Sequence, residues 1–171
     1  NFGVIYGISG FGLARNLRIP RAEAQAFIDT YFKRFPEIRT YMDETVMSAK
    51  ENGYVKTLFG RKIHTPEIGA KGPHAGFAKR AAINAPIQGS AADISKLAML
   101  TRYDKMQQQN FKAQMLLQVH DELIFEAPED EAEKLVSVAR EVMETACLPL
   151  IELEVPLVAD AGVADNWMDA H

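Results

Sequence analysis

Apolar residues recur at spacings of three and four through the first third of the chain, and this pattern predicts amphipathic helices. One helix is expected from Pro20 to Phe35 and another from Pro36 to Gly53, because proline suits the first turn of a helix and glycine its end. Residues 1–16 are also expected to be helical, with bends at their glycines.

Shorter apolar runs bounded by turn residues predict strands. Residues 54–58 and 61–65 are expected to form a hairpin, followed by a loop over 66–76. The later elements predicted are a helix over 76–109 that is interrupted near Pro86, strands at 114–119 and 122–127 around His120-Asp121, a helix over Glu129–Cys147, and a last strand at 153–159. These elements indicate an α+β fold, in which a helical segment precedes an antiparallel sheet backed by helices.

Composition narrows the class of protein. A 171-residue chain that is 47% hydrophobic can build a core, and no apolar run reaches the roughly 18 residues of a membrane helix. Its single cysteine, Cys147, excludes a disulfide framework and a cysteine-rich zinc site, so a reducing, cytoplasmic environment is expected. Because the chain begins at Asn1 in what reads as the middle of a motif, we expect it to be part of a longer protein.

Charge is distributed unevenly along the chain. Residues 1–110 carry 16 Lys/Arg and 9 Asp/Glu, whereas residues 111–171 carry 3 and 14. Such asymmetry suggests a surface for a polyanion on one side of the molecule. A clustering of acidic surface helices late in the chain would produce the same asymmetry.

Asp121 and Glu122 place two adjacent carboxylates at the rim of the predicted sheet. Magnesium takes few protein carboxylates, since substrate phosphates and water supply its other oxygens. The pair could therefore give one or two metal ligands, with the rest from another element. Ordinary turn chemistry is the alternative interpretation, because hairpin turns also accommodate histidine and aspartate.

Arg80, Asn84 and Gln88 are four residues apart and share one face of the predicted helix. Their donors match the acceptors that the minor groove of a duplex presents at every base pair. Such a face could test base-pair geometry without reading sequence. An exposed polar stripe beside a kink at Pro86 is the alternative. Phe2 and Tyr6, also four apart, could stack on a base or sugar, although either could equally be a core residue.

These segments, in this order, resemble the family A DNA polymerases of the bacterial type. Residues 1–7 resemble the second half of the fingers motif, residues 80–93 the duplex-contacting segment, and residues 118–123 the palm motif with its metal-binding aspartate. Residues 53–57 and 60–62 are also similar to the family pattern. The resemblance implies fingers over 1–75 and the C-terminal part of the palm over 76–171.

The resemblance also implies roles for individual residues. Asp121 would be a catalytic metal ligand, with Glu122 a lesser contributor, and His120 would lie near the primer terminus. Arg80, Asn84 and Gln88 would contact the primer or template. Phe2 would contact the incoming sugar, and Tyr6 would pack near the templating base. Gly7 would act as a pivot during closure.

Taken together, these roles imply a DNA-directed DNA polymerase of replication and repair that uses primer-template DNA, deoxynucleoside triphosphates and two Mg²⁺ ions. The basic arm of the fingers motif and the second palm aspartate would lie before Asn1, so the chain alone is expected to be inactive. Two alternatives stay open: a duplex DNA-binding module without catalysis, and a helical interaction domain whose motifs arise by accident.

Overall fold

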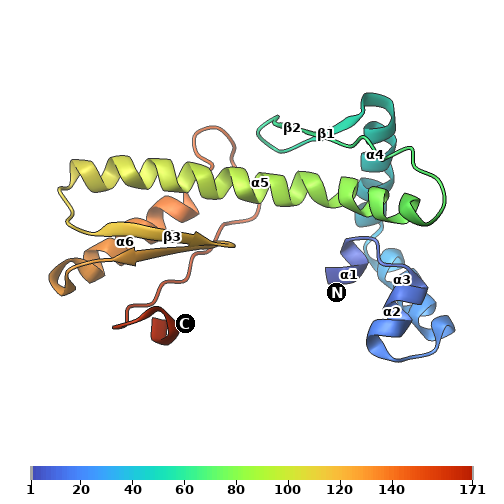
Figure 1. The fold of residues 1–171 in the computed structure, drawn as a ribbon, viewed down its shortest axis with the longest axis horizontal. Coiled ribbons are helices and arrows are strands. Elements are labelled where there is room, and N and C mark those ends of the chain that lie inside the picture. Colours follow the sequence, from blue (N-terminus) through green and yellow to red (C-terminus); the bar gives the residue numbers. More distant parts are fainter. Residues whose placement is uncertain (1, 171) are drawn as a thin grey trace. The chain divides into compact units, whose positions relative to one another are not determined.

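The computed structural model describes residues 2–170, apart from the side chains of Phe2 and Pro73. The chain forms two compact units that divide between Gly89 and Ser90. The helix α5 (Pro73–Gln108) contributes to both units (Figure 1). No helix among the described residues is long and apolar enough to cross a membrane.

The first four helices lie close to where the sequence predicts. They are α1 (Phe2–Ile5), α2 (Gly10–Leu17), α3 (Arg21–Arg34) and α4 (Pro36–Asn52). The predicted bends in the first 16 residues are confirmed, because the helix breaks between α1 and α2, where Gly7 has a φ of 78°. Gly53 ends α4 in the left-handed conformation (φ 76°), which glycine adopts without steric cost.

A short antiparallel hairpin follows α4. Strand β1 (Tyr54–Lys56) pairs with β2 (Lys62–His64), with Val55 opposite Ile63. Val55 is buried with Ala49 of α4 and Ala82 of α5, so the hairpin packs against both helices. The predicted hairpin is therefore confirmed, with shorter strands than expected.

The predicted interruption near Pro86 is wrong. Helix α5 runs unbroken from Pro73 to Gln108, and it begins within the segment that was expected to be a loop. Proline removes one backbone donor from the helix but does not prevent continuation when neighbouring elements hold the backbone. Tyr41 of α4 is one such neighbour, since its hydroxyl donates a hydrogen bond of 2.9 Å to the carbonyl oxygen of Ile83.

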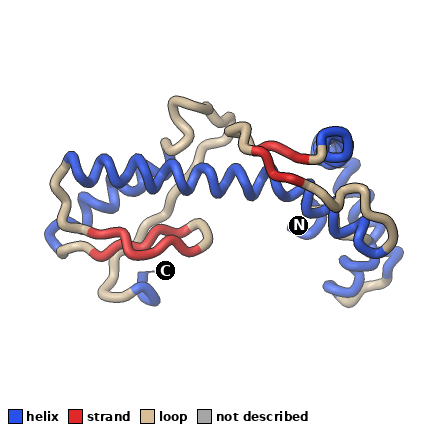
Figure 2. Tube along the Cα trace, turned by 45° about the horizontal axis from the view of Figure 1, so that its top comes forward, coloured by secondary structure: helices blue, strands red, loops and turns tan. Residues whose placement is uncertain are grey.

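The second unit contains the rest of α5 and a second hairpin, which Figure 2 shows as a separate pair of strands. Strand β3 (Gln114–Val119) pairs with β4 (Glu122–Glu126), and the register slips between Met115 and Leu117. A bulge at this point explains why the adjacent Leu116 and Leu117 are both about half exposed, at 51% and 52%.

Helix α6 (Ala132–Glu144) follows a short 3₁₀ turn at Glu129–Glu131, and a second such turn spans Trp167–Ala170. Val138 and Val142 of α6 pack on Ala98 of α5, and Leu135 packs with Met106 and Ala113. The core of this unit therefore lies between α5, α6 and the base of the hairpin.

Arg102 lies buried in the second unit, on the α5 face that meets the hairpin. Its guanidinium lies 4.4 Å from the ring centre of Phe125 in β4. Burial away from water lowers its pKa. A planar cation over an aromatic face thus joins α5 to the hairpin.

The strand predicted at 153–159 does not form, and the predicted helix ends at Glu144 rather than Cys147. A strand needs a partner backbone, and among the described residues β3 and β4 pair only with each other. The end of this segment bonds instead to side chains of α6: Arg140 Nε donates to the oxygen of Ala159, whose amide donates to Glu144 Oε1. The α+β class is confirmed.

Candidate nucleic-acid interface and carboxylate pair

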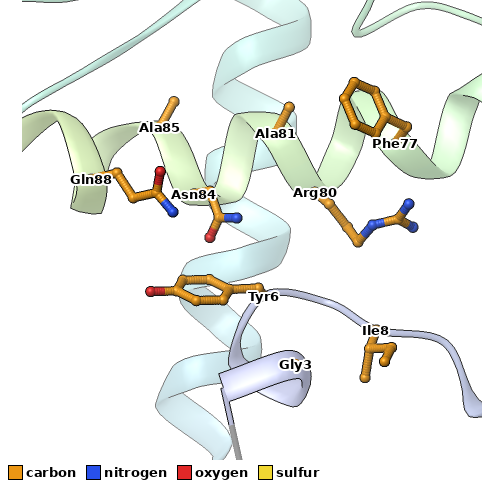
Figure 3. Close-up of a pocket in the computed structure, with 9 residues that line it drawn as sticks. All are labelled: Gly3, Tyr6, Ile8, Phe77, Arg80, Ala81, Asn84, Ala85 and Gln88. Atoms are coloured by element: carbon orange, nitrogen blue, oxygen red, sulfur yellow. The ribbon is translucent and has the colours of Figure 1, made fainter. Parts of the chain in front are cut away.

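An open pocket of about 570 Å³ lies in the first unit, between α5 and the N-terminal segment. Figure 3 shows Arg80 and Asn84 projecting from α5 toward that segment, with the ring of Tyr6 beneath Asn84. The lining residues are Gly3, Tyr6, Ile8, Phe77, Arg80, Ala81, Asn84, Ala85 and Gln88. The structure thus brings together the predicted polar face and one of the two predicted aromatic residues.

The four-residue spacing explains why Arg80, Asn84 and Gln88 share this pocket, since one helical turn separates each from the next. Arg80 and Asn84 are half-buried and Gln88 is exposed. The buried Oδ1 atom of Asn84 has no hydrogen-bond partner among the described residues. A buried polar atom of this kind usually has a partner, so Asn84 indicates a pocket that an outside polar group would complete.

Gly7 is required where the N-terminal segment approaches α5. A Cβ atom there would lie 3.3 Å from Met42 Cε and 3.4 Å from Arg80 Cγ. Its positive φ also favours glycine, because a side chain would be strained in that conformation. Gly7 therefore brings Tyr6 close to Arg80. The prediction for Phe2 concerns a side chain that lies outside the described part of the chain.

Tyr41 of α4 supports the backbone of α5 beside the pocket. Its hydroxyl bonds to the Ile83 carbonyl, one residue before Asn84. Burial raises the pKa of this phenol, while a hydrogen bond with the side chain of Thr45 acts in the opposite direction. The half-buried phenol therefore stays protonated, as a hydrogen-bond donor to α5 must.

The carboxylate pair lies at the tip of the second hairpin. His120 and Asp121 form the turn between β3 and β4, and Glu122 begins β4; all three are exposed. His120 adopts a φ of 52°, a conformation in which histidine is enriched among non-glycine residues. The side-chain amide of Gln118 donates to the His120 carbonyl oxygen, and this bond ties the turn to β3.

The carboxylates at this tip suit magnesium, because carboxylate oxygens are its usual protein ligands and one or two carboxylates suffice. Nevertheless, no three His, Cys, Asp or Glu side chains within the described residues lie close enough to enclose a metal ion. Asp121 and Glu122 could therefore provide part of a metal site, and further ligands would have to approach the hairpin tip.

Glu131 holds the base of the same hairpin. Its carboxylate accepts hydrogen bonds from the backbone amides of Lys112 (2.9 Å) and Ala113 (3.2 Å), which immediately precede β3. Glu131 therefore has a structural role, because it satisfies the two amides that lead into β3.

Sequence reasoning missed several residues around the pocket. Phe77 lines it and is 61% exposed, an unusual position for a phenylalanine. Its spacing of three from Arg80 is the signal that could have found it. Tyr41 carries no such signal, because its contact with α5 joins residues 42 positions apart.

Comparisons with known proteins agree on one family. The sequence profile of DNA polymerase family A matches residues 1–169. DNA polymerase I of Rhizobium leguminosarum is 51% identical over all of this chain and 17% of its own length. DNA polymerase I of Bacillus subtilis (strain 168) is 48% identical over 99% of this chain and 19% of its own length. The chain thus spans less than a fifth of these relatives.

A solved structure gives the same result for the fold. The POL domain of Pol1 from M. smegmatis, in complex with a DNA primer-template and dNTP, matches with a TM-score of 0.90 and 40% identity. The match covers 99% of this chain and 29% of that one. Sequence and structure together show that the chain belongs to DNA polymerase family A.

Proposed function

We propose that this chain is the C-terminal fingers and palm portion of a DNA-directed DNA polymerase acting in replication and repair. Its parent protein would add deoxynucleotides from their triphosphates to a primer 3′ end. The fingers portion would cover residues 1–75 and the palm portion residues 76–171. Supporting this, the similar POL domain of M. smegmatis Pol1 was solved with primer-template DNA and dNTP.

The pocket along α5 is the observation that carries the proposal. Arg80, Asn84 and Gln88 place a cation and two amides along one open hollow. The minor groove presents acceptors at every base pair and a donor at guanine, and amides can serve both. We propose that the three residues contact the duplex near the primer end. Their contacts would then depend on base-pair shape rather than on sequence.

The aromatic side of the pocket would serve the nucleotide. Tyr6 lies across from Asn84, where it could pack near the templating base. Gly7 is the residue that its left-handed backbone and its close approach to Arg80 favour. Because glycine has no side chain to restrict its backbone, it would also allow the N-terminal segment to pivot. Phe2 would contact the incoming sugar. Selection of the nucleotide would then accompany closure of this segment.

The exposed hairpin tip would serve the chemistry. Asp121, aided by Glu122, would hold Mg²⁺ together with carboxylates from elsewhere in the parent protein. When bound, Mg²⁺ would supply electrostatic stabilisation to the transferring phosphoryl group. The exposure of Asp121 leaves its oxygens open to approach, and His120, the first residue of the same turn, would lie near the primer terminus.

Primer extension by the full-length parent protein tests this proposal. We expect Asp121→Ala to lower magnesium-dependent extension about a thousand-fold or more, since metal stabilisation is worth several kcal/mol. Duplex binding should persist because the pocket is untouched. Asp104→Ala removes an exposed carboxylate from α5 and serves as the matched control. Normal extension by Asp121→Ala would favour the second candidate, a DNA-binding module without catalysis, which the pocket alone would support.

A further inference from the structure

The turn between β1 and β2 is closed by a network around one buried residue. Thr57 is only 5% exposed, and its Oγ1 accepts a hydrogen bond of 3.2 Å from the amide of Arg61. The amide of Thr57 donates to the Arg61 carbonyl, and the amide of Gly60 donates to the Thr57 carbonyl. These hydrogen bonds hold the turn in one conformation, from which the Arg61 side chain reaches the backbone of α5.

The hairpin contacts α5 at Gly89. Arg61 Nη2 donates a hydrogen bond of 3.0 Å to the Gly89 carbonyl oxygen. A Cβ atom on Gly89 would lie 2.7 Å from Ile63 Cδ1 and 2.8 Å from Thr57 Cγ2. The hairpin thus occupies the space that any side chain at position 89 would need.

The contact falls where α5 is least able to hold its own geometry. Pro86, three residues earlier, removes a helical hydrogen bond. Gly89 itself is less favourable in a helix than alanine, because it loses more backbone freedom on folding. Gln88 lies between these two residues and lines the pocket. The hairpin therefore contacts the backbone that carries Gln88 at a point where the helix is weakened.

We propose that the β1–β2 hairpin, seated on Gly89, is a positioning element that holds Gln88 in the pocket for the primer-template duplex. The inference rests on the proposed function, because it assigns a support to one of the proposed duplex contacts. It assigns no direct contact with DNA to Gly89, Thr57 or Ile63.

Gly89→Ala is the sharpest test because it changes no charge. Arg61 is less suitable, since removing a cation weakens DNA binding whatever its role. In the full-length polymerase we expect Gly89→Ala to raise the Kd for a primer-template duplex about five-fold, the effect of one lost hydrogen bond. Gly69→Ala is the matched control, because a Cβ there meets nothing within 4 Å.

A double-mutant cycle separates positioning from general destabilisation. If Gly89→Ala acts through Gln88, it should weaken binding little further once Gln88→Ala is present. Fully additive effects would overturn the proposal. If Gln88→Ala itself binds DNA as the wild type does, both the positioning role and the duplex contact fall. The polymerase assignment is tested separately, by the extension assay with Asp121→Ala.

A compensating variant identifies the cause of the change. Ile63→Val and Thr57→Ser together remove Cδ1 and Cγ2 while keeping the Thr57 hydroxyl that closes the turn. Added to Gly89→Ala, they should restore the Kd to within about two-fold of the wild type, since less than about 0.5 kcal/mol would then remain. Continued weak binding by this triple variant, with circular dichroism unchanged, would overturn the proposal.

Discussion

The pocket on α5 and the tip of the β3–β4 hairpin are built in opposite ways. In the pocket, Arg80 and Asn84 are half-buried, and Tyr41 of α4 donates a hydrogen bond to the helix that carries them. At the hairpin tip, Asp121 lies in the turn and Glu122 in the last strand pair, opposite Val119, and both carboxylates are exposed. One site is shaped by its own unit, whereas the other presents its ligands outward.

This difference indicates how much of each site must come from residues outside its own unit. A duplex contact needs a firm surface whose donors are already placed, and packing within one unit can provide it. A metal centre needs several ligands converging on one point, and the described residues offer only adjacent carboxylates there. The four predictions that follow test this contrast between a preorganised surface and an incomplete ligand set.

Arg80→Ala should produce the largest change in the pocket. We expect the full-length protein to bind primer-template duplex about 30-fold more weakly, or ~2 kcal/mol, because a charge-assisted contact is lost. Fluorescence titration at fixed salt gives this value. Arg15→Ala, an exposed charge on α2 outside the pocket, is the control. Equal losses in the two variants would mean that net charge, not the pocket, determines binding.

Glu131→Ala tests whether the hairpin depends on its base. The amides of Lys112 and Ala113 lose their acceptor, and we expect the free energy of unfolding to fall by about 2 kcal/mol. Hydrogen exchange should accelerate at these two amides, and extension should slow while duplex affinity stays constant. Glu133→Ala, an exposed acid on α6, is the control. Unchanged exchange at both amides would refute the support role.

Glu122→Gln separates the two carboxylates of the tip. Because Glu122 is proposed as the lesser contributor to the metal site, its substitution should lower kcat about ten-fold, which raises the activation free energy by ~1.4 kcal/mol. Duplex affinity should not change. Raising the magnesium concentration should recover part of the rate, which single-turnover extension measures. Glu126→Gln, at the far end of β4, should behave like the wild type. A loss as large as that of Asp121→Ala would make Glu122 an equal ligand.

Tyr41→Phe should give the smallest change. Loss of its bond to Ile83 should cost about 1 kcal/mol of stability and weaken duplex binding a few-fold. Folding raises the pKa of this phenol above the ordinary value of 10.0. The contribution of Tyr41 to the free energy of unfolding is therefore complete below pH 10.0 and declines as the pH rises above it. Alkaline unfolding should therefore show less pH dependence in Tyr41→Phe. Tyr103→Phe, on the exposed face of α5, provides the comparison.

The sequence was a good guide wherever local chemistry decides structure. Gly53 ends α4 as predicted, and the turn at His120 joins β3 to β4. Two of the errors arise where elements distant in the sequence decide the outcome. Helix α5 continues through Pro86 while Tyr41 bonds to the preceding turn. Residues 153–159 have a strand-like sequence but lack a partner strand among the described residues.

The candidate site divides in the same manner. Periodicity alone places Arg80, Asn84 and Gln88 on one helix face, because a helix repeats every 3.6 residues whatever surrounds it. Only the tertiary structure decided that this face lines a pocket with Tyr6 and Phe77, and that a hairpin fills the space beside Gly89. Those facts depend on packing between segments far apart in the chain, and no local spacing encodes such packing.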